Sequence, residues 1–207
     1  MFVIGLTGGI ACGKSEVSKR LQERGLPIVD ADVVAREVVE PGTPVLSQLV
    51  EYFGDGILGN DGTLDRKRLG NLVFSDRDML EHLNAIIHPA IWKRTLEHLG
   101  ELAEVRHCQV AVLVAPLLLE HGAEALTDAV WVVSCSEEVQ MQRLCRRDNL
   151  NESQARARLQ AQMPLSSKCE RADYVLENEG DLTQLDEQID MALSLLDCRL
   201  NNTDDTI

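Results

Sequence analysis

A glycine-rich segment near the start of the chain has the residue types and the spacing of a phosphate-binding loop. Residues 8–15 read GGIACGKS and match the P-loop pattern G-x-x-x-x-G-K-[ST]. Glycines let successive backbone N–H groups turn toward phosphate oxygens, and a helix that begins at the lysine adds its free N–H groups and its dipole. The pattern predicts that Lys14 reaches the β- and γ-phosphates and that the Ser15 hydroxyl is one ligand of Mg²⁺.

Two other nucleotide-binding patterns are excluded by spacing. A dinucleotide loop, G-x-G-x-x-G, needs glycine at position 10, where this chain has Ile10. The GTPase patterns N-K-x-D and D-x-x-G do not occur in the chain. An ATP-dependent kinase or ATPase remains. The predicted ATP-binding residues are Gly9, Ile10, Ala11, Cys12, Gly13, Lys14, Ser15 and Glu16.

Two aspartates, Asp30 and Asp32, follow the apolar segment 27–29, which comes directly after the P-loop helix. Ligands of parallel α/β sheets collect beyond the carboxyl ends of the strands. One carboxylate can accept the proton of an attacking hydroxyl, and the other can hold a metal-bound water or a neighbouring turn. Alternatively, both cap a helix that begins near Val33. We predict that Asp32 is catalytic and leave the role of Asp30 open.

A cluster of arginines is informative in a chain this acidic. Arg143 and Arg147 are four residues apart and therefore share one face of a helix. Phosphoryl transfer needs positive charge on the migrating group, which arginine supplies with bidentate contacts. The alternative is a solvated helix whose arginines pair with acidic neighbours. We predict that Arg143 and Arg147 are catalytic and leave open the roles of Arg146, Arg156 and Arg158.

A second Mg²⁺ ligand is not identified by the sequence. The apolar segment 108–115 is followed by Pro116 and Glu120, without the aspartate that often ends such a strand in P-loop enzymes. Glu120, Asp30 or Asp32 could act through Mg²⁺-bound water, and the sequence does not choose among them.

The elements that must position these residues follow from hydrophobic spacing. A strand over 2–7, a helix over 14–24 and a strand over 27–29 form a βαβ unit, which predicts a parallel sheet. Helical spacing then covers 46–53, 66–74, 77–87 and 90–103, with a break at His88-Pro89. Buried strands are predicted at 108–115, 129–135 and 174–176, and helices at 136–147 and 182–200.

Composition excludes several classes of protein. With 207 residues the chain suits one domain, and its net charge of −14 disfavours a nucleic-acid partner. No apolar run approaches the roughly 18 residues that a membrane span needs. The six cysteines are scattered without metal-ligand spacing, which favours a reducing compartment. We expect a cytoplasmic monomer that binds neither nucleic acid nor membranes.

The motifs taken together resemble the dephospho-CoA kinase family over nearly the whole chain. The resemblance rests on the P-loop, VDADVVAREVVEPG at 29–42, DGTLDR at 61–66 and LNAIIHPAI at 83–91. APLLLE at 115–120, the pattern Q-x-x-R-x-x-x-R-D at 140–148, AQM at 161–163 and ADYVLENEG at 172–180 complete it.

This resemblance implies a three-layer P-loop kinase fold of the α/β class. The core would comprise about 1–32, 105–139 and 166–200, with a helical CoA-binding insertion at about 33–104 and a lid at about 140–165. The implied reaction moves the γ-phosphate of ATP, with Mg²⁺, to the ribose 3′-hydroxyl of dephospho-CoA, giving coenzyme A and ADP. By resemblance, Asp32 matches the catalytic base, and Arg143 and Arg147 match the lid arginines.

The chain departs from the family at three P-loop positions. The family usually has Gly-Ser where this chain has Ala11-Cys12, and Thr where it has Glu16. Glu16 brings negative charge near the expected α-phosphate, so we predict that Glu16→Thr lowers the KM for ATP. Cys12 is either an inert thiol or, if the loop lowers its pKa, an oxidation-sensitive one. The competing functions are another small-molecule kinase of this fold and a non-catalytic nucleotide-binding regulator.

Overall fold

The computed structural model describes residues 1–73 and 76–204, which fold as two compact units. The first unit contains Met1–Ile28 and the chain from Cys108 onward, and the second contains Val29–His107. The predicted helical insertion, 33–104, falls inside the second unit.

The chain forms one parallel sheet of apolar strands, which belong to the first unit except for the last two residues of β2. These are β1 (Phe2–Gly8), β2 (Ile28–Asp30), β3 (Val110–Val114), β4 (Ala129–Ser134) and β5 (Tyr174–Glu177), in the order β2-β3-β1-β4-β5. Both β3 and β4 run parallel to β1, and β5 runs parallel to β4. Most residues of β1, β3 and β4 are buried, as expected for strands covered on both faces. The predicted α/β class with a parallel sheet is confirmed.

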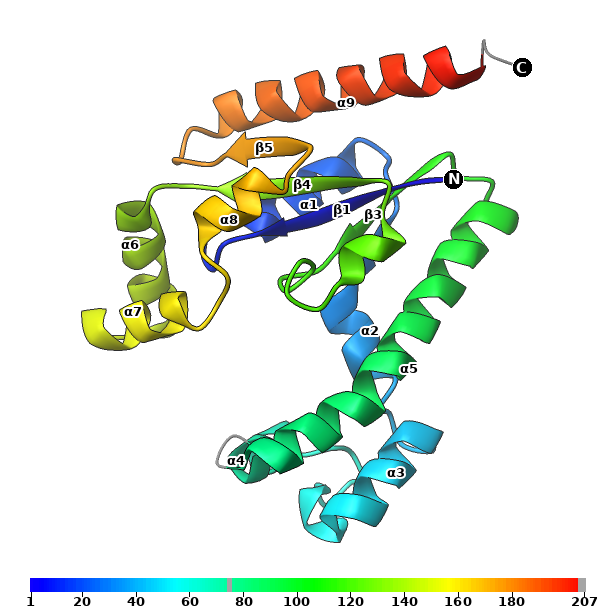
Figure 1. Ribbon diagram of the computed structural model, residues 1–207, viewed down its shortest axis with the longest axis vertical. Helices are drawn as coiled ribbons and strands as arrows, with labels where there is room; N and C mark the ends of the chain where they lie inside the picture. Colours follow the sequence, from blue (N-terminus) through cyan, green and yellow to red (C-terminus); the bar gives the residue numbers. More distant parts are fainter. Residues whose placement is uncertain (74–75, 205–207) are drawn as a thin grey trace. The chain divides into compact units, whose positions relative to one another are not determined.

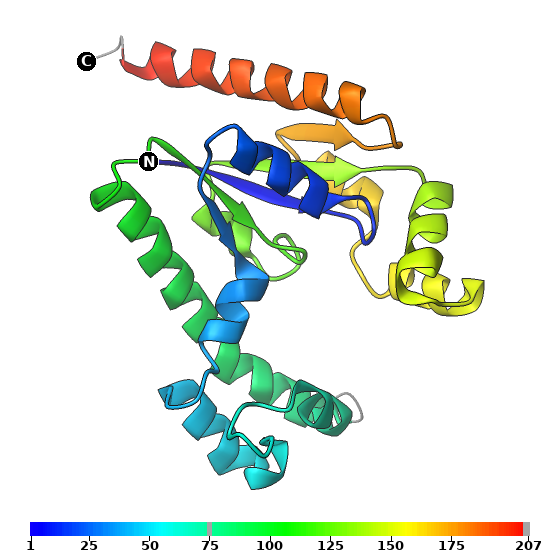
Figure 2. The same ribbon diagram turned by 180° about the vertical axis from the view of Figure 1, so that it is seen from behind.

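Helices cover both faces of this sheet. They are α1 (Lys14–Glu23), α8 (Leu165–Glu170) and α9 (Leu182–Asp204), with the short 3-10 helix η2 (Ala123–Leu126). Helices α6 (Glu137–Asp148) and α7 (Glu152–Gln160) lie beyond the carboxyl end of β4. Figures 1 and 2 show α1 and α9 on one face and α8 on the other. Buried Val17 and Leu21 of α1 share one core with Leu185 and Ile189 of α9. This packing fixes the start of α1, and therefore the P-loop, at the carboxyl end of β1.

The second unit is helical. It contains α2 (Ala31–Glu37), α3 (Pro44–Phe53), the 3-10 helix η1 (Asp55–Ile57), α4 (Arg66–Val73) and α5 (Arg77–Glu104). Local sequence explains two of the helix starts. The Thr43 hydroxyl accepts from the N–H of Leu46, and the Asp76 carboxylate accepts from the N–H groups of Asp78 and Met79.

One expectation for the second unit is wrong. The sequence predicts two helices separated at His88-Pro89, whereas α5 continues through Pro89. Proline removes one intrahelical hydrogen bond, but α5 packs along α2, α3 and α4, and that tertiary packing outweighs the local penalty. The helix predicted over 66–74 ends at Val73, and position 74 lies outside the described residues. Across the described residues, every helix is too short or too polar to cross a membrane.

Candidate functional site

The loop between β1 and α1 has the backbone conformation that anion binding requires. Gly13 has φ 93° and Ala11 has φ 60°, both in the left-handed region. Gly13 is also the N-cap of α1 and has no side chain that could occupy the first N–H groups of the helix. Left-handed geometry costs an L-residue such as Ala11 about 1–2 kcal/mol. The loop therefore holds a strained curl whose N–H groups are suited to phosphate oxygens.

Two buried amide side chains hold the outer side of this loop. Gln140 Nε2 donates to the carbonyl of Ile10 at 2.8 Å, and Asn178 Nδ2 donates to the carbonyl of Cys12 at 2.8 Å. Our sequence reasoning assigned no role to either residue. The available signal was their presence inside the motifs at 140–148 and 172–180.

The thiol of Cys12 is buried against a second cysteine. Its Sγ lies 3.5 Å from Sγ of Cys135, which follows β4. Contact with Cys135 and burial raise the pKa of Cys12. The hydrogen bond with Cys12 and the nearby Arg143 charge lower the pKa of Cys135. Cys12 therefore keeps its proton at neutral pH, which favours the inert-thiol interpretation over an oxidation-sensitive loop cysteine.

Ser15 and Glu16 lie in the first turn of α1. Ser15 is exposed in the first turn, where its hydroxyl is accessible. Oε1 of Glu16 accepts from Nε of Arg20 at 2.9 Å, one turn further on. Arg20 also pairs with Asp186 of α9. The carboxylate of Glu16 is thus directed toward a cation and partly neutralised, which weakens its expected repulsion of an α-phosphate.

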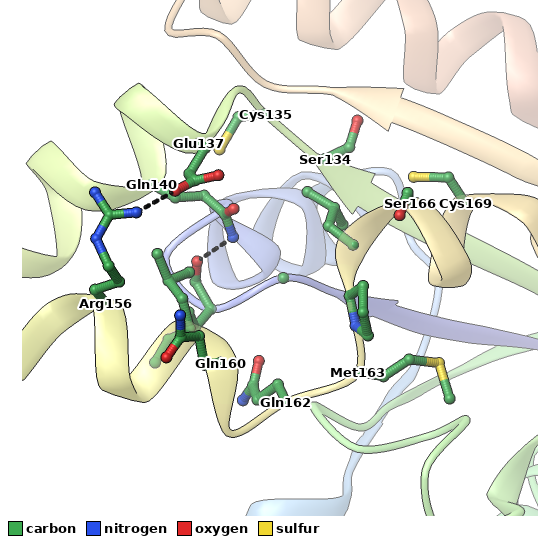
Figure 3. A pocket seen from close by; sticks show the side chains of 15 residues that line it. Ser134, Cys135, Glu137, Gln140, Arg156, Gln160, Gln162, Met163, Ser166 and Cys169 are labelled. Carbon is green, nitrogen blue, oxygen red and sulfur yellow. Dashed lines mark hydrogen bonds and ion pairs between the residues drawn. The ribbon is translucent and has the colours of Figure 1, made fainter.

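A cavity of about 750 Å³ opens beside the P-loop (Figure 3). Its wall combines Gly9 and Ile10 of the loop with Gln140 of α6 and Arg156 of α7. The connection from α7 to α8 completes it with Gln162, Met163 and Pro164. Part of the predicted lid therefore forms one side of a space next to the phosphate-binding loop.

The arginines of the predicted lid have different partners. Arg143 Nη1 donates to the backbone carbonyl of Asn178 at 2.9 Å, and Arg147 Nε pairs with Asp148 at 2.8 Å. Arg158 also binds Asp148, and the flanking charges lower the pKa of that carboxyl group. Arg156 pairs with Glu137 at 3.1 Å and, among the described arginines, is the one that lines the cavity. The structure thus brings Arg156 next to the P-loop, while Arg147 faces its acidic neighbour.

Glu120 is committed to a buried ion pair. Its Oε1 lies 2.7 Å from Nζ of Lys168, a fully buried lysine that also donates to the carbonyl of Pro116 at 3.0 Å. The N–H of Met163 donates to Glu120 as well. This pair anchors the residues that follow the lid to the end of β3. No sequence signal marked Lys168, because a single lysine in a helix is usually solvated.

The predicted catalytic base lies in the second unit, in the first turn of α2. Asp32 is exposed, and its N–H donates to the side chain of Asp30 at 2.8 Å. Asp30 is therefore the cap of α2, whereas Asp32 lies inside the helix. The alternative that both aspartates cap a helix near Val33 is thus correct for Asp30 only, and the helix begins earlier, at Ala31. Nη2 of Arg66, from α4, donates to the carbonyl of Ala35 at 3.1 Å, which places its guanidinium group beside α2.

The charges around Asp32 include two arginines that our sequence reasoning missed. Burial and the neighbouring Arg36 charge lower the pKa of Arg66, and Asp32 acts in the opposite direction. Both arginines stand inside motifs already noted at 29–42 and 61–66. Of the two, Arg66 is the arginine whose charge interacts with the carboxylate of the candidate base.

The donor set is poor for a metal held by protein alone. Within 1–73 and 76–204, no group of three or more His, Cys, Asp and Glu side chains could hold a metal ion. An ion bound mainly by phosphate oxygens and water, with one protein hydroxyl, fits this composition.

Known proteins resemble this chain over most of its length. A family model described as dephospho-CoA kinase matches residues 2–184. A dephospho-CoA kinase from Anaeromyxobacter dehalogenans is 51% identical over 87% of this chain and 85% of its own. A crystal structure from Thermus thermophilus superimposes with a TM-score of 0.81 at 34% identity, covering 94% of this chain and 97% of its own.

A solved dephospho-CoA kinase from Campylobacter jejuni has a TM-score of 0.64 at 25% identity and covers 93% of this chain and 95% of its own. The predicted resemblance, the P-loop kinase fold and the class of enzyme are confirmed by these matches. A family model that spans most of the chain, together with a P-loop folded as the motif requires, shows that this chain belongs to the dephospho-CoA kinase family.

Proposed function

We propose that the chain transfers the γ-phosphate of ATP to the ribose 3′-hydroxyl of dephospho-CoA, giving coenzyme A and ADP. The observation that carries the proposal is the curled P-loop at the start of α1, in a chain whose family acts on this acceptor. Backbone N–H groups of residues 9–16 and the ammonium group of Lys14 bind the β- and γ-phosphates. Asp32 accepts the proton of the attacking 3′-hydroxyl.

Positive charge on the migrating phosphoryl group comes from the lid. Arg143 and Arg147 are the proposed donors, and Arg156 is a further candidate because it lines the cavity beside Gly9 and Ile10. Arg147 and Arg156 are already paired with carboxylates, so each must exchange that partner for phosphate oxygens. Arg143 donates to the Asn178 carbonyl through Nη1, and its other N–H donors can serve phosphate while that bond stays in place. Positioning and neutralisation of charge account for most of the rate in such reactions.

Mg²⁺ is the proposed divalent ion, since it keeps several water ligands and accepts phosphate oxygens. Ser15 would hold it through its exposed hydroxyl group. When bound, Mg²⁺ supplies charge neutralisation across the β- and γ-phosphates. Glu120 is not proposed as a further ligand because it is engaged by Lys168. We further propose that the enzyme acts as a cytoplasmic monomer without nucleic-acid or membrane partners.

The first test is ADP release from the purified chain with Mg²⁺-ATP, comparing dephospho-CoA with AMP, CMP and gluconate. Turnover with dephospho-CoA alone supports the proposal. Preference for another acceptor would refute dephospho-CoA as the substrate but would still support kinase activity. ATP binding without ADP release in any mixture refutes catalysis and favours a regulator. Dephospho-CoA should also protect the second unit, 29–107, from proteolysis.

A further inference from the structure

The P-loop is held from outside by two buried amides that come from distant parts of the chain. Gln140 lies on α6 and is 5% exposed, and Asn178 follows β5 and is 4% exposed. Each directs its NH₂ group at one loop carbonyl, at 2.8 Å in both cases. Buried amides need partners, and here the partners are backbone carbonyl groups of the P-loop.

The glycines of the motif make room for these amides. A Cβ atom added at Gly9 would come within 2.4 Å of Nε2 of Gln140, and one added at Gly13 within 2.1 Å of Nδ2 of Asn178. Gly9 and Gly13 are therefore required for close approach of the amides as well as for backbone curvature. The P-loop and the two amide side chains are therefore packed directly against each other.

Peptide geometry links these hydrogen bonds to phosphate binding. The C=O and the N–H of one trans peptide point in opposite directions because the group is planar. When Gln140 draws the carbonyl of Ile10 outward, the N–H of Ala11 is turned the other way. Asn178 does the same for the N–H of Gly13 by holding the carbonyl of Cys12.

The same helix secures both amides. Gln140 stands on α6, and one turn later Arg143 donates to the backbone carbonyl of Asn178 at 2.9 Å. At the start of α6, the N–H and the hydroxyl of Ser136 donate to Glu179 at 2.6 and 3.0 Å. Helix α6 thus connects the P-loop with the residues after β5.

We propose that Gln140 and Asn178 are positioning residues of the ATP site, which orient the N–H groups of Ala11 and Gly13 toward the nucleotide phosphates. The inference rests on the proposed use of the P-loop for ATP and adds the residues that shape it. They act on nucleotide binding through the loop backbone.

The test uses near-isosteric variants, Gln140→Glu and Asn178→Asp, which replace a donor NH₂ with an oxygen that repels the loop carbonyl. Calorimetry measures binding of Mg²⁺-ATP and of inorganic triphosphate, which lacks the nucleoside. We expect each variant to weaken both ligands by about 10-fold, the size of one well-placed hydrogen bond. The KM for ATP should rise, while the KM for dephospho-CoA stays within about 2-fold.

Gln188→Glu is the matched control. The amide of Gln188 also donates to a backbone carbonyl, that of Glu177, at 2.9 Å, but it lies outside the P-loop contacts. Its substitution should leave both affinities unchanged. If Asn178→Asp does not fold, Gln140→Glu and Gln140→Ala decide the question alone.

Two results would overturn the inference. Loss of affinity for ATP without loss for triphosphate would show that the amides serve the nucleoside and not the loop. Unchanged affinity for both ligands in folded variants would show that the hydrogen bonds only fill the core. Since triphosphate binding needs no acceptor, a wild-type chain that fails to phosphorylate dephospho-CoA refutes the proposed function and leaves this binding series interpretable.

Discussion

The P-loop and the lid arginines belong to the same unit but are held by different kinds of interaction. The loop is fixed by neutral hydrogen bonds from buried amides, with Cys12 packed against Cys135. Three arginines of α6 and α7, Arg147, Arg156 and Arg158, are about half exposed where they pair with acidic side chains, whereas Arg143 donates to the backbone carbonyl of Asn178. A buried donor that loses its partner lowers the stability of the fold by about 1–3 kcal/mol. An exposed ion pair contributes only about 0–1 kcal/mol to that stability.

This difference matches two tasks: the P-loop must hold its N–H groups in one geometry, and the lid arginines must change partners. A site that must present N–H groups in one geometry benefits from rigid, desolvated contacts. Arginines that must transfer to phosphate oxygens benefit from partners that they can release at little cost. Salt should therefore affect the lid pairs and leave the hydrogen bonds of the loop nearly unchanged.

The largest effect is expected from a substitution in the rigid P-loop. Gly13→Ala places a Cβ 2.1 Å from Nδ2 of Asn178 at a residue with φ 93°. We expect ATP affinity to fall at least about 100-fold, because the loop must move away from its donor geometry. Calorimetry measures the loss.

Gly25→Ala is the control for this change, since Gly25 has a similar φ of 88° and open space around it. It should lose stability through backbone strain and keep its ATP affinity. Equal affinity in both variants would show that the loop tolerates the collision.

The second prediction concerns Asp32, which lies in the other unit. Asp32→Asn should reduce turnover by about 100-fold, the usual contribution of a general base, with little change in the KM for ATP. Asp30→Asn is the matched control because asparagine still caps α2. Steady-state kinetics with dephospho-CoA distinguish them, and full activity in Asp32→Asn would remove Asp32 from the chemistry.

A smaller effect is expected from releasing lid arginines. Asp148→Asn frees Arg147 and Arg158 from their shared partner. Exposed pairs of this kind contribute about 0.2–1 kcal/mol, so the KM for ATP should fall about 1.4- to 5-fold at low salt. The gain should disappear near 0.5 M salt, where the Debye length falls to about half of its value at physiological ionic strength. A gain that persists in high salt would contradict an electrostatic origin.

The smallest effect is expected at Glu16. Glu16→Thr should lower the KM for ATP by less than about 2-fold, because Arg20 already neutralises part of the carboxylate charge and exposed pairs are weak. Measuring the same substitution together with Arg20→Gln sharpens the comparison. If the pair with Arg20 is the reason for the small effect, Glu16→Thr should have a larger effect when Arg20 is absent.

The sequence by itself determined those features of the protein that are encoded by residues close together in the chain. The P-loop, the strand and helix around it and the parallel sheet follow from local spacing, because hydrophobic period and glycine placement act over a few residues. The family could also be recognised, since its motifs are short runs. The division of roles between Asp30 and Asp32 was left open, and the structure assigns Asp30 to the helix cap.

Only the tertiary structure decided which distant side chains support the site. Gln140 and Asn178 lie 130 and 166 positions from the carbonyls that they hold, and Lys168 lies 52 positions from Pro116. Nothing in the local spacing of a lone Gln, Asn or Lys distinguishes a buried partner from a solvated one. The continuation of α5 through Pro89 has the same cause: packing against three helices outweighed a local signal. Burial and the partners it demands are properties of the folded chain.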